Sequence, residues 1–289
     1  MKVYVSLTSI YDNQSALLST LKSISSQTTK PDKCFLYLSE NAYLLDKGFK
    51  NRELNTDLHG FLSRNDLFEI KWCDNIGPYR KLLPLLKEKW DEDCVIITID
   101  DDTVYDPTLI ENYVHDYDQY QCCISYRGFT MYFRTSLKEI VYTKHDVLNH
   151  KYLYNFHTGK GGVAYHPRFF RKTGQLIFDR GLYTHCCETG DDVWFNFLRI
   201  SNNVECYVKD QKYVISDHST SLSLYNNFNM KNDLNTKNIQ KTITKLMELS
   251  VLKDIGYTFD SNSYWENRYK NKGNSGDGSY GDKALFKGN

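Results

Sequence analysis

The sequence of 289 residues predicts an α/β protein with one main domain, in which helices flank a mostly parallel central sheet and a smaller mixed sheet lies beside it. Three observations predict this fold class. Apolar runs of strand length alternate with segments of helical periodicity along the N-terminal part. Hydrophobic residues make up 40% of the chain and charged residues 25%, as in soluble globular proteins. The length is within reach of one large α/β domain.

The N-terminal part contains four expected strands, at residues 2–7, 34–38, 67–73 and 94–99. The first helix follows Asp12, a residue type suited to capping it. A second helix is expected at residues 54–62, and a third begins at Gly77-Pro78 and runs to Trp90, since proline suits a first helical turn. Strands separated by helices indicate βαβ units and a mostly parallel sheet.

The C-terminal part is less regular. Short aromatic strands are expected at residues 124–133 and 162–165, a further strand at 204–208, and helices at 191–200 and 236–252. After Asp260 the chain becomes polar and rich in Gly, Asn and Lys, which is typical of a linker. The sequence therefore predicts a domain over residues 1–259 and a tail over 260–289.

Composition excludes several classes of protein. Lys plus Arg equals Asp plus Glu at 36 each, which argues against a nucleic-acid partner. No stretch approaches the roughly 18 apolar residues of a membrane span, and the first eight residues do not resemble a secretory signal, so a cytoplasmic protein is expected. The eight cysteines flank apolar runs or stand in adjacent pairs, which predicts reduced thiols rather than disulfides. His185-Cys186-Cys187-Glu188 lacks the spacing of a zinc site.

Polar residues follow each of the four N-terminal strands. In parallel sheets, ligands bind at the carboxyl ends of the strands. The residues at those ends are Thr8, Ser9, Ser39, Glu40, Asp74, Asn75, Asp100, Asp101 and Asp102. Carboxylates crowded like Asp100 to Asp102 repel one another unless a cation compensates them, and Mg²⁺ or Mn²⁺ prefers such oxygen ligands. The alternative is an acidic turn in contact with solvent.

Several motifs along residues 2–223 together resemble those of GT-A glycosyltransferases, and especially surface-polysaccharide enzymes with an Asp-Asp-Asp variant of the DxD motif. Each motif is weak alone, whereas their order and spacing are specific. The segments that carry the resemblance are residues 5–10, 36–40, 74–82, 100–107, 161–167 and 188–194.

The resemblance implies roles for the acidic triplet and its surroundings. Asp100 or Asp101 would contact the ribose of a nucleotide, and Asp102 would bind the metal. His218 would complete the metal shell, although a single histidine is as often structural. Lys81 would face the donor diphosphate, and Arg80 beside it is also placed for phosphate near a helix start. The alternative is that both are solvated surface residues.

The acidic pair Asp191-Asp192 resembles the motif that carries the catalytic base. Asp192 is our first choice and Asp191 the second, although many relatives have Glu-Asp at this place. The alternative is that both residues only favour the N-terminus of a helix. Gly161, Gly162 and Tyr165 resemble the loop that lines the sugar pocket.

The implied function is metal-dependent glycosyl transfer, by a hexosyl- or pentosyltransferase, from a nucleotide-sugar donor to a glycan acceptor. Uridine diphosphate (UDP) is the expected carrier, Mn²⁺ or Mg²⁺ the expected cofactor, and inversion the expected outcome. One alternative is a sugar nucleotidylyltransferase, but residues 8–14 lack the Gly, Lys and Arg usual in that class. A second alternative is an inactive carbohydrate-binding module.

The tail carries a second resemblance. Residues 264–269 and 273–281 resemble the lead-in to certain S-adenosylmethionine-dependent methyltransferases, but the Gly-rich cofactor strand does not follow. The resemblance implies the N-terminal piece of a glycosyltransferase–methyltransferase fusion, and a piece that does not itself methylate.

Overall fold

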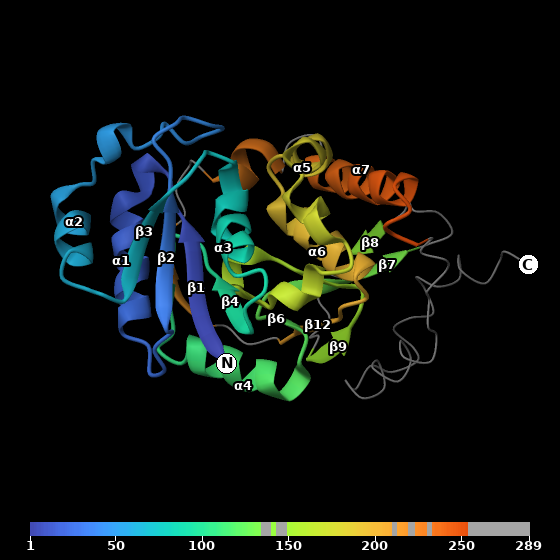
Figure 1. Ribbon diagram of the computed structural model, residues 1–289, viewed down its shortest axis with the longest axis horizontal. Coiled ribbons are helices and arrows are strands. Elements are labelled where there is room, and N and C mark those ends of the chain that lie inside the picture. Colours follow the sequence, from blue (N-terminus) through green and yellow to red (C-terminus); the bar gives the residue numbers. More distant parts are fainter. Residues whose placement is uncertain (134–139, 143–148, 210–212, 219–222, 230–232, 254–289) are drawn as a thin grey trace, which may run out of the picture.

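Parallel strands form one half of the central sheet in the computed structural model, which describes residues 1–133, 140–142, 149–209, 213–218, 223–229 and 233–253 (Figure 1). This half has the order β3-β2-β1-β4, with all three pairs parallel. Its strands are β1 (Lys2–Thr8), β2 (Lys33–Leu38), β3 (Phe68–Trp72) and β4 (Cys94–Thr98). Every residue of β4 is buried, as expected for a strand covered on both faces.

The other half of the sheet mixes directions. Strand β11 (Val163–Tyr165) runs antiparallel to both β4 and β6 (Cys123–Ser125). Strand β12 (Cys206–Val208) is parallel to β6, and β9 (His150–Tyr152) lies antiparallel at the edge. Across the described residues, the sheet thus has eight strands and remains mostly parallel.

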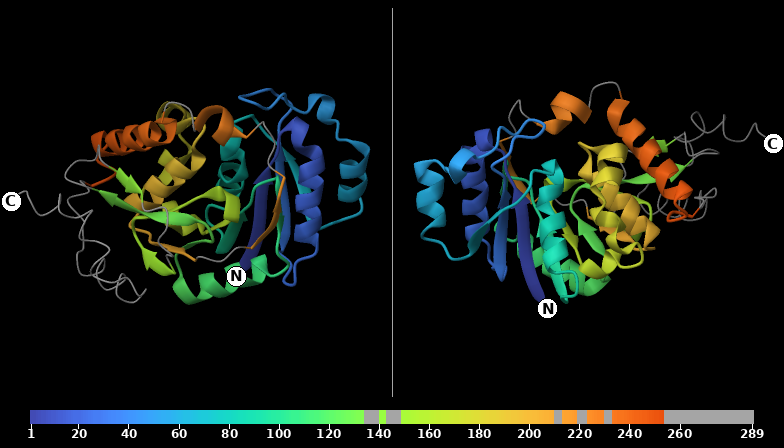
Figure 2. Two further views of the ribbon diagram at one scale, coloured as in Figure 1. Left: turned by 180° about the vertical axis from the view of Figure 1, so that it is seen from behind. Right: turned by 45° about the horizontal axis from the view of Figure 1, so that its top comes forward.

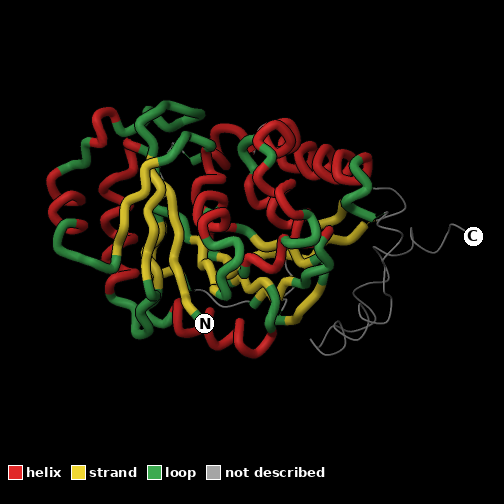
Figure 3. The backbone as a smooth tube through the Cα atoms, viewed as in Figure 1, coloured by secondary structure: helices red, strands yellow, loops and turns green. Residues whose placement is uncertain are grey.

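Helices cover the sheet in two groups. In Figure 1, α1 and α2 lie at one end, whereas α5, α6 and α7 pack together over the other half. Figure 3 shows the strands of the first half side by side, with helices around them. The helices are α1 (Gln14–Ser25), α2 (Thr56–Leu62), α3 (Leu83–Glu88), α4 (Leu109–Tyr120), α5 (Arg180–Cys187), α6 (Asp191–Ser201) and α7 (Leu234–Glu248).

Two small antiparallel sheets stand in place of the single smaller sheet that was expected. One contains β10 (Asn155–His157), β7 (Gly128–Phe133) and β8 (Ile140–Tyr142). The other pairs β13 (Val214–Asp217) with β5 (Thr103–Tyr105), the strand directly after the acidic triplet. Figure 2 shows the molecule from behind and with its top tilted forward.

Local chemistry explains where the helices depart from expectation. Asp12 does not cap α1; it lies in a 3-10 turn, and the helix begins after Asn13 without a side-chain cap. The expected helix from Gly77 to Trp90 divides into a 3-10 turn, Gly77–Lys81, and α3. Pro84 explains the division, because it lacks the N–H that a continuous helix would need there and is tolerated only in the first turn of a helix, where it stands in α3. Helices α4 and α5 were not predicted.

Three further expectations concern the cysteines, membrane spans and the C-terminal tail. All eight cysteines are free, as predicted, and Cys73 alone among them is not fully buried. No helix in the described part of the chain has the length and apolar character to cross a membrane. The predicted tail at residues 260–289 lies outside the described residues.

Candidate functional site

A cleft of about 1330 Å³ opens at the carboxyl ends of β1 and β4. This is where the strand-end rule places a ligand site. The cleft is lined from both halves of the sheet: by residues 8–10, 43–46, 77–78, 80–81 and 99–102 on one side, and by residues 127–129, 156, 158–160, 189–193 and parts of 223–239 on the other.

Asp101 of the acidic triplet is tied to the turn after β1. It accepts hydrogen bonds from the Ser9 hydroxyl and, at 3.3 Å, from the side-chain amide of Asn13. Burial, together with the charges of Asp102 and Asp100, raises the pKa of Asp101 to about 7 against the effect of those hydrogen bonds. The predicted residues Ser9 and Asp101 therefore meet, and Thr8 lines the cleft beside them.

The backbones of Asp102 and His218 are also in contact. The antiparallel pair β5–β13 places Asp217 opposite Thr103, and the next backbone N–H, that of His218, donates to the carbonyl of Asp102 at 2.7 Å. The His218 ring contacts the Ser216 hydroxyl at 3.0 Å, and Asp217 forms an ion pair with Lys160. Burial, followed by the charges of Asp100 and Asp217, raises the pKa of Asp102.

Lys81 connects the two acidic motifs. Its ammonium lies 3.3 Å from Oδ1 of Asp100 and 3.0 Å from Oδ2 of Asp191. Burial alone would lower the pKa of Lys81, but the carboxylates of Asp100, Asp191 and Asp192 raise it well above its usual range. Lys81 is therefore a fixed cation between segments about a hundred residues apart in the sequence.

Asp192 is held from one side only. Its Oδ2 accepts the backbone N–H of Gly159 at 3.0 Å, while Oδ1 is buried without a hydrogen-bond partner among the described residues. Burial raises the pKa of Asp192 to about 7, although Lys81 opposes the shift. Asp191 and Asp192 do lie in the first turn of α6, where acidic residues favour the helix dipole, and their side chains also contact Lys81 and the backbone of Gly159.

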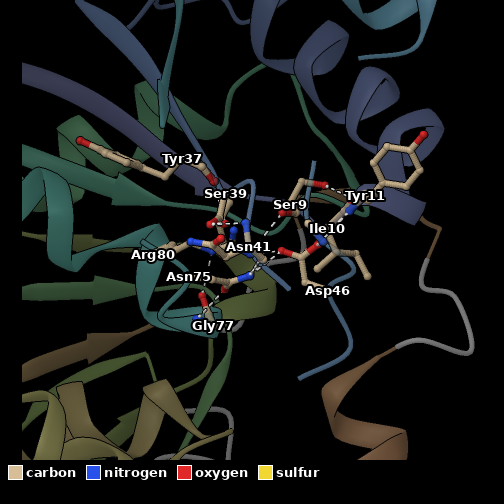
Figure 4. A network of polar contacts seen from close by, with 12 residues as sticks. Ser9, Ile10, Tyr11, Tyr37, Ser39, Asn41, Asp46, Asn75, Gly77 and Arg80 are labelled. Atoms are coloured by element: carbon tan, nitrogen blue, oxygen red, sulfur yellow. Dashed lines mark hydrogen bonds and ion pairs between the residues drawn. The ribbon is translucent and has the colours of Figure 1, made fainter. Parts of the chain in front are cut away.

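A buried network lies at the end of the cleft next to β2 (Figure 4). Asp46 Oδ2 accepts from Nη2 of Arg80 at 2.8 Å and from the side-chain amide of Asn75 at 3.0 Å. Its Oδ1 accepts the backbone N–H groups of Gly48 at 3.0 Å and Tyr11 at 3.2 Å. Arg80 is 1% exposed, and its Nη1 has no hydrogen-bond partner among the described residues.

Four predicted nucleotide-binding residues do not line the cleft: Ser39, Glu40, Asp74 and Asn75. Ser39 is buried and accepts the backbone N–H of Asn41. Glu40 forms an exposed ion pair with Arg52 at 3.0 Å, and Asp74 is exposed. Asn75 supports the site indirectly, because it binds Asp46 and the carbonyl of Asn41.

The predicted sugar-pocket residues lie behind the cleft wall. Tyr165 is 1% exposed, and its hydroxyl contacts the His157 ring at 3.2 Å. Gly162 has φ +85°, and a Cβ there would lie 3.0 Å from the Tyr113 hydroxyl, so it allows a tight turn against the core. Gly161 is buried as well.

Sequence reasoning missed the cleft-lining residues Asp46, Arg127, Phe129 and Gly159. Asp46 lies in an irregular loop that a bridge between Tyr43 and Asp46 closes, and no periodic pattern marks it. Gly161 and Gly162 were singled out from the sequence in this Gly-rich segment, whereas Gly159 is the glycine that lines the cleft.

Residues suited to metal binding are only partly assembled. Within the described ranges, no group of three or more His, Cys, Asp or Glu side chains is arranged to hold a metal ion. Asp102 has the right donor chemistry, and Asp100 and Asp217 lie near enough to raise its pKa. This crowding of carboxylates is compatible with a hard divalent cation.

Compared by sequence, the chain matches no family description and no curated protein. Compared by structure, it is similar to residues 1–349 of TarS from S. aureus in complex with UDP-GlcNAc, with a TM-score of 0.55 and 10% identity, over 93% of this chain and 73% of the other. The same TarS segment in a second structure gives a TM-score of 0.50 and 12% identity, over 86% of this chain and 73% of that one.

A cytidylyltransferase of Francisella tularensis, acting on 2-C-methyl-D-erythritol 4-phosphate, gives 14% identity over 83% of this chain and all of the other, but a TM-score of only 0.43. That likeness is too low to bear on function. The TarS similarity confirms the fold class: a GT-A-like α/β fold with a large, mostly parallel sheet.

Proposed function

We propose that this chain is a glycosyltransferase that moves a sugar from a UDP-sugar donor to a hydroxyl group of a glycan acceptor with inversion. One observation carries the proposal: the cleft brings Asp100 and the pair Asp191-Asp192 around the buried ammonium of Lys81. A carboxylate beside a fixed cation offers a base for the acceptor and a counter-charge for a diphosphate in one cavity.

Asp192 is the proposed general base. Its buried Oδ1 has a free lone pair, and its raised pKa makes it a stronger base than an exposed aspartate. Oδ1 would take the proton of the acceptor hydroxyl while that oxygen attacks the anomeric carbon. The bond from that carbon to the nucleoside diphosphate breaks, and the electron pair leaves with the phosphate oxygen.

The donor would extend from the Asp46 network to Lys81. Arg80 Nη1 is a buried donor in need of an acceptor, as a base carbonyl oxygen would provide. Lys81 would lie beside the diphosphate and balance part of its charge. The choice of uridine draws support from TarS, which holds UDP-GlcNAc in a fold of this type.

We also propose a divalent cation, Mn²⁺ or Mg²⁺, on Asp102 with help from His218. When bound, such a cation neutralises charge that develops on the departing diphosphate. The fit rests on the crowding of carboxylates there: burial, and then the charges of Asp100 and Asp217, raise the pKa of Asp102. Asp100 and Asp217 are the remaining oxygen donors at this edge of the cleft.

Donor hydrolysis tests the proposal without knowledge of the acceptor. The purified chain is incubated with UDP-sugars and Mn²⁺, and the release of UDP is measured. We expect slow release, and a loss of at least about 100-fold in Asp192→Asn, in line with the contribution of general bases. Asp91→Asn, at an exposed turn, is the matched control.

The products separate the alternatives drawn from the sequence. A nucleotidylyltransferase would form a nucleotide-sugar and pyrophosphate from a nucleoside triphosphate and a sugar phosphate. An inactive module would bind sugar without releasing UDP. Absence of UDP release from every UDP-sugar tested, with the chain folded, would refute the proposed transferase.

A further inference from the structure

Gly159 lies where the two acidic motifs of the cleft meet. Its backbone N–H donates to Oδ2 of Asp192 at 3.0 Å. A Cβ built on Gly159 would lie 2.6 Å from Nζ of Lys81, 3.3 Å from Oδ1 of Asp192 and 3.5 Å from Oδ1 of Asp100. A side chain at this single backbone position would therefore meet Asp192, Lys81 and Asp100.

The need for glycine at this position is steric. Gly159 is not among the glycines with positive φ, so its backbone is open to other residues. The constraint is the Lys81 ammonium, because 2.6 Å is closer than a carbon and a nitrogen can approach without displacement. Lysine side chains usually yield, but this one is buried and held by Asp100 and Asp191, so displacement would separate buried charges.

The orientation of the Asp192 carboxylate also depends on Gly159. The Gly159 N–H occupies Oδ2, and Oδ1 is left buried without a hydrogen-bond partner in the described chain. A carboxylate fixed through one oxygen presents the other in a defined direction. Reactions that require aligned groups lose about 100-fold in rate when one of them moves by about 1 Å.

We propose that Gly159 is a positioning residue for the transfer reaction. Its N–H fixes Asp192 so that Oδ1 accepts the proton, and its missing side chain leaves the space in which Lys81 bridges Asp100 and Asp191. The inference rests on the proposed function for its catalytic part, whereas the steric relation to Lys81 stands independently of it.

A double-mutant cycle tests the inference. Gly159→Ala, Lys81→Ala and the double variant are compared with the unmodified chain in kcat and KM for UDP-sugar hydrolysis and in melting temperature. We expect Gly159→Ala to lower kcat about 100-fold with a smaller change in KM. In the Lys81→Ala background the same substitution should change kcat less than about threefold, because the added methyl no longer displaces an ammonium.

Melting temperature provides a readout that does not need activity. Gly159→Ala should lower it in the unmodified chain and lower it less when Lys81 is alanine. Gly60→Ala, on α2, is the control, because its Cβ would meet only the end of Arg64 at an ordinary 3.5 Å. Should Gly159→Ala fail to fold, the double variant should fold, since the close contact is absent from it.

Independent effects of Gly159→Ala and Lys81→Ala, in kcat and in melting temperature, would overturn the inference. So would a kcat within about threefold of the unmodified chain in Gly159→Ala, or a double variant that fails to fold where Lys81→Ala folds. These outcomes differ from failure of the proposed function, in which the unmodified chain itself releases no UDP.

Discussion

Replacement of Asp101 by asparagine should stabilise the folded chain at alkaline pH. Asp101 is partly buried and accepts hydrogen bonds from Ser9 and Asn13, and an asparagine oxygen can accept the same bonds. The substitution therefore removes the charge and keeps the shape and the hydrogen bonds.

The magnitude follows from the shift in pKa. The pKa of Asp101 rises from 3.8 to about 7 on folding, chiefly because of burial. At about 1.36 kcal/mol per pKa unit, this shift corresponds to about 4 kcal/mol. Asp101 retains some contact with solvent, which screens its charge, so we expect about 2 kcal/mol.

The sign follows from proton linkage. The folded state holds the Asp101 proton more tightly than the unfolded state does, so this stabilisation is fully present below pH about 4 and is lost as the pH rises through 7. The asparagine side chain of the variant does not titrate. The variant should therefore exceed the unmodified chain in stability by about 2 kcal/mol at pH 8, and this difference should shrink towards pH 4.

Urea denaturation in EDTA between pH 4 and pH 9 measures this difference, and Asp91→Asn provides the control at an exposed carboxylate. Titrating groups that do not interact with Asp101, such as Asp192, contribute equally to both chains and cancel. A difference that stays constant with pH, or that grows towards acid, would refute the reasoning.

Three further predictions concern the cleft and the tail. Asp102→Asn should abolish Mn²⁺-assisted UDP binding while the chain stays folded; unchanged affinity by calorimetry would contradict the metal assignment. The value of kcat/KM for donor hydrolysis should rise with pH and level off above about 7, because Asp192 must be ionised to act as a base, and a profile that is flat from pH 5 to 9 would exclude that role. Deletion of residues 261–289 should leave hydrolysis within a few-fold, since so polar a segment buries little apolar surface, whereas loss of folding would make the tail part of the domain.

The four parallel strands could be predicted to within one or two residues, because each is a run of apolar residues between polar ones. The divided helix after Gly77 could not, because Pro84 interrupts a pattern whose apolar residues still recur at helical spacing. Helix α4 was missed since half of its buried apolar positions are tyrosines, Tyr113 and Tyr117, which favour strands as readily.

In the cleft, too, residues that follow regular strands could be predicted, whereas residues in irregular loops could not. Asp101 and Ser9 follow strands, and their meeting could be anticipated because strand ends share one edge of the sheet. Asp46 could not be found this way, because its position depends on the irregular turn at Tyr43–Asp46 and on Gly48 with φ +75°. Of the neighbouring glycines, Gly159 rather than Gly162 lines the cleft, and the sequence alone does not distinguish them.

Charged side chains from the two halves of the cleft interact with one another. Two ammonium groups, those of Lys81 and Lys160, stand among six carboxylates: Asp100, Asp101, Asp102, Asp191, Asp192 and Asp217. Burial, with added repulsion from neighbouring carboxylates, raises the pKa of Asp101 and Asp192 to about 7, so the folded chain retains protons that an exposed aspartate would release. A cation bound near Asp102 would add the missing positive charge, and the pKa of Asp101 should then fall. The pH-dependent gain from Asp101→Asn should therefore diminish in Mn²⁺ relative to EDTA, and an equal gain in both would show that no cation reaches this cluster.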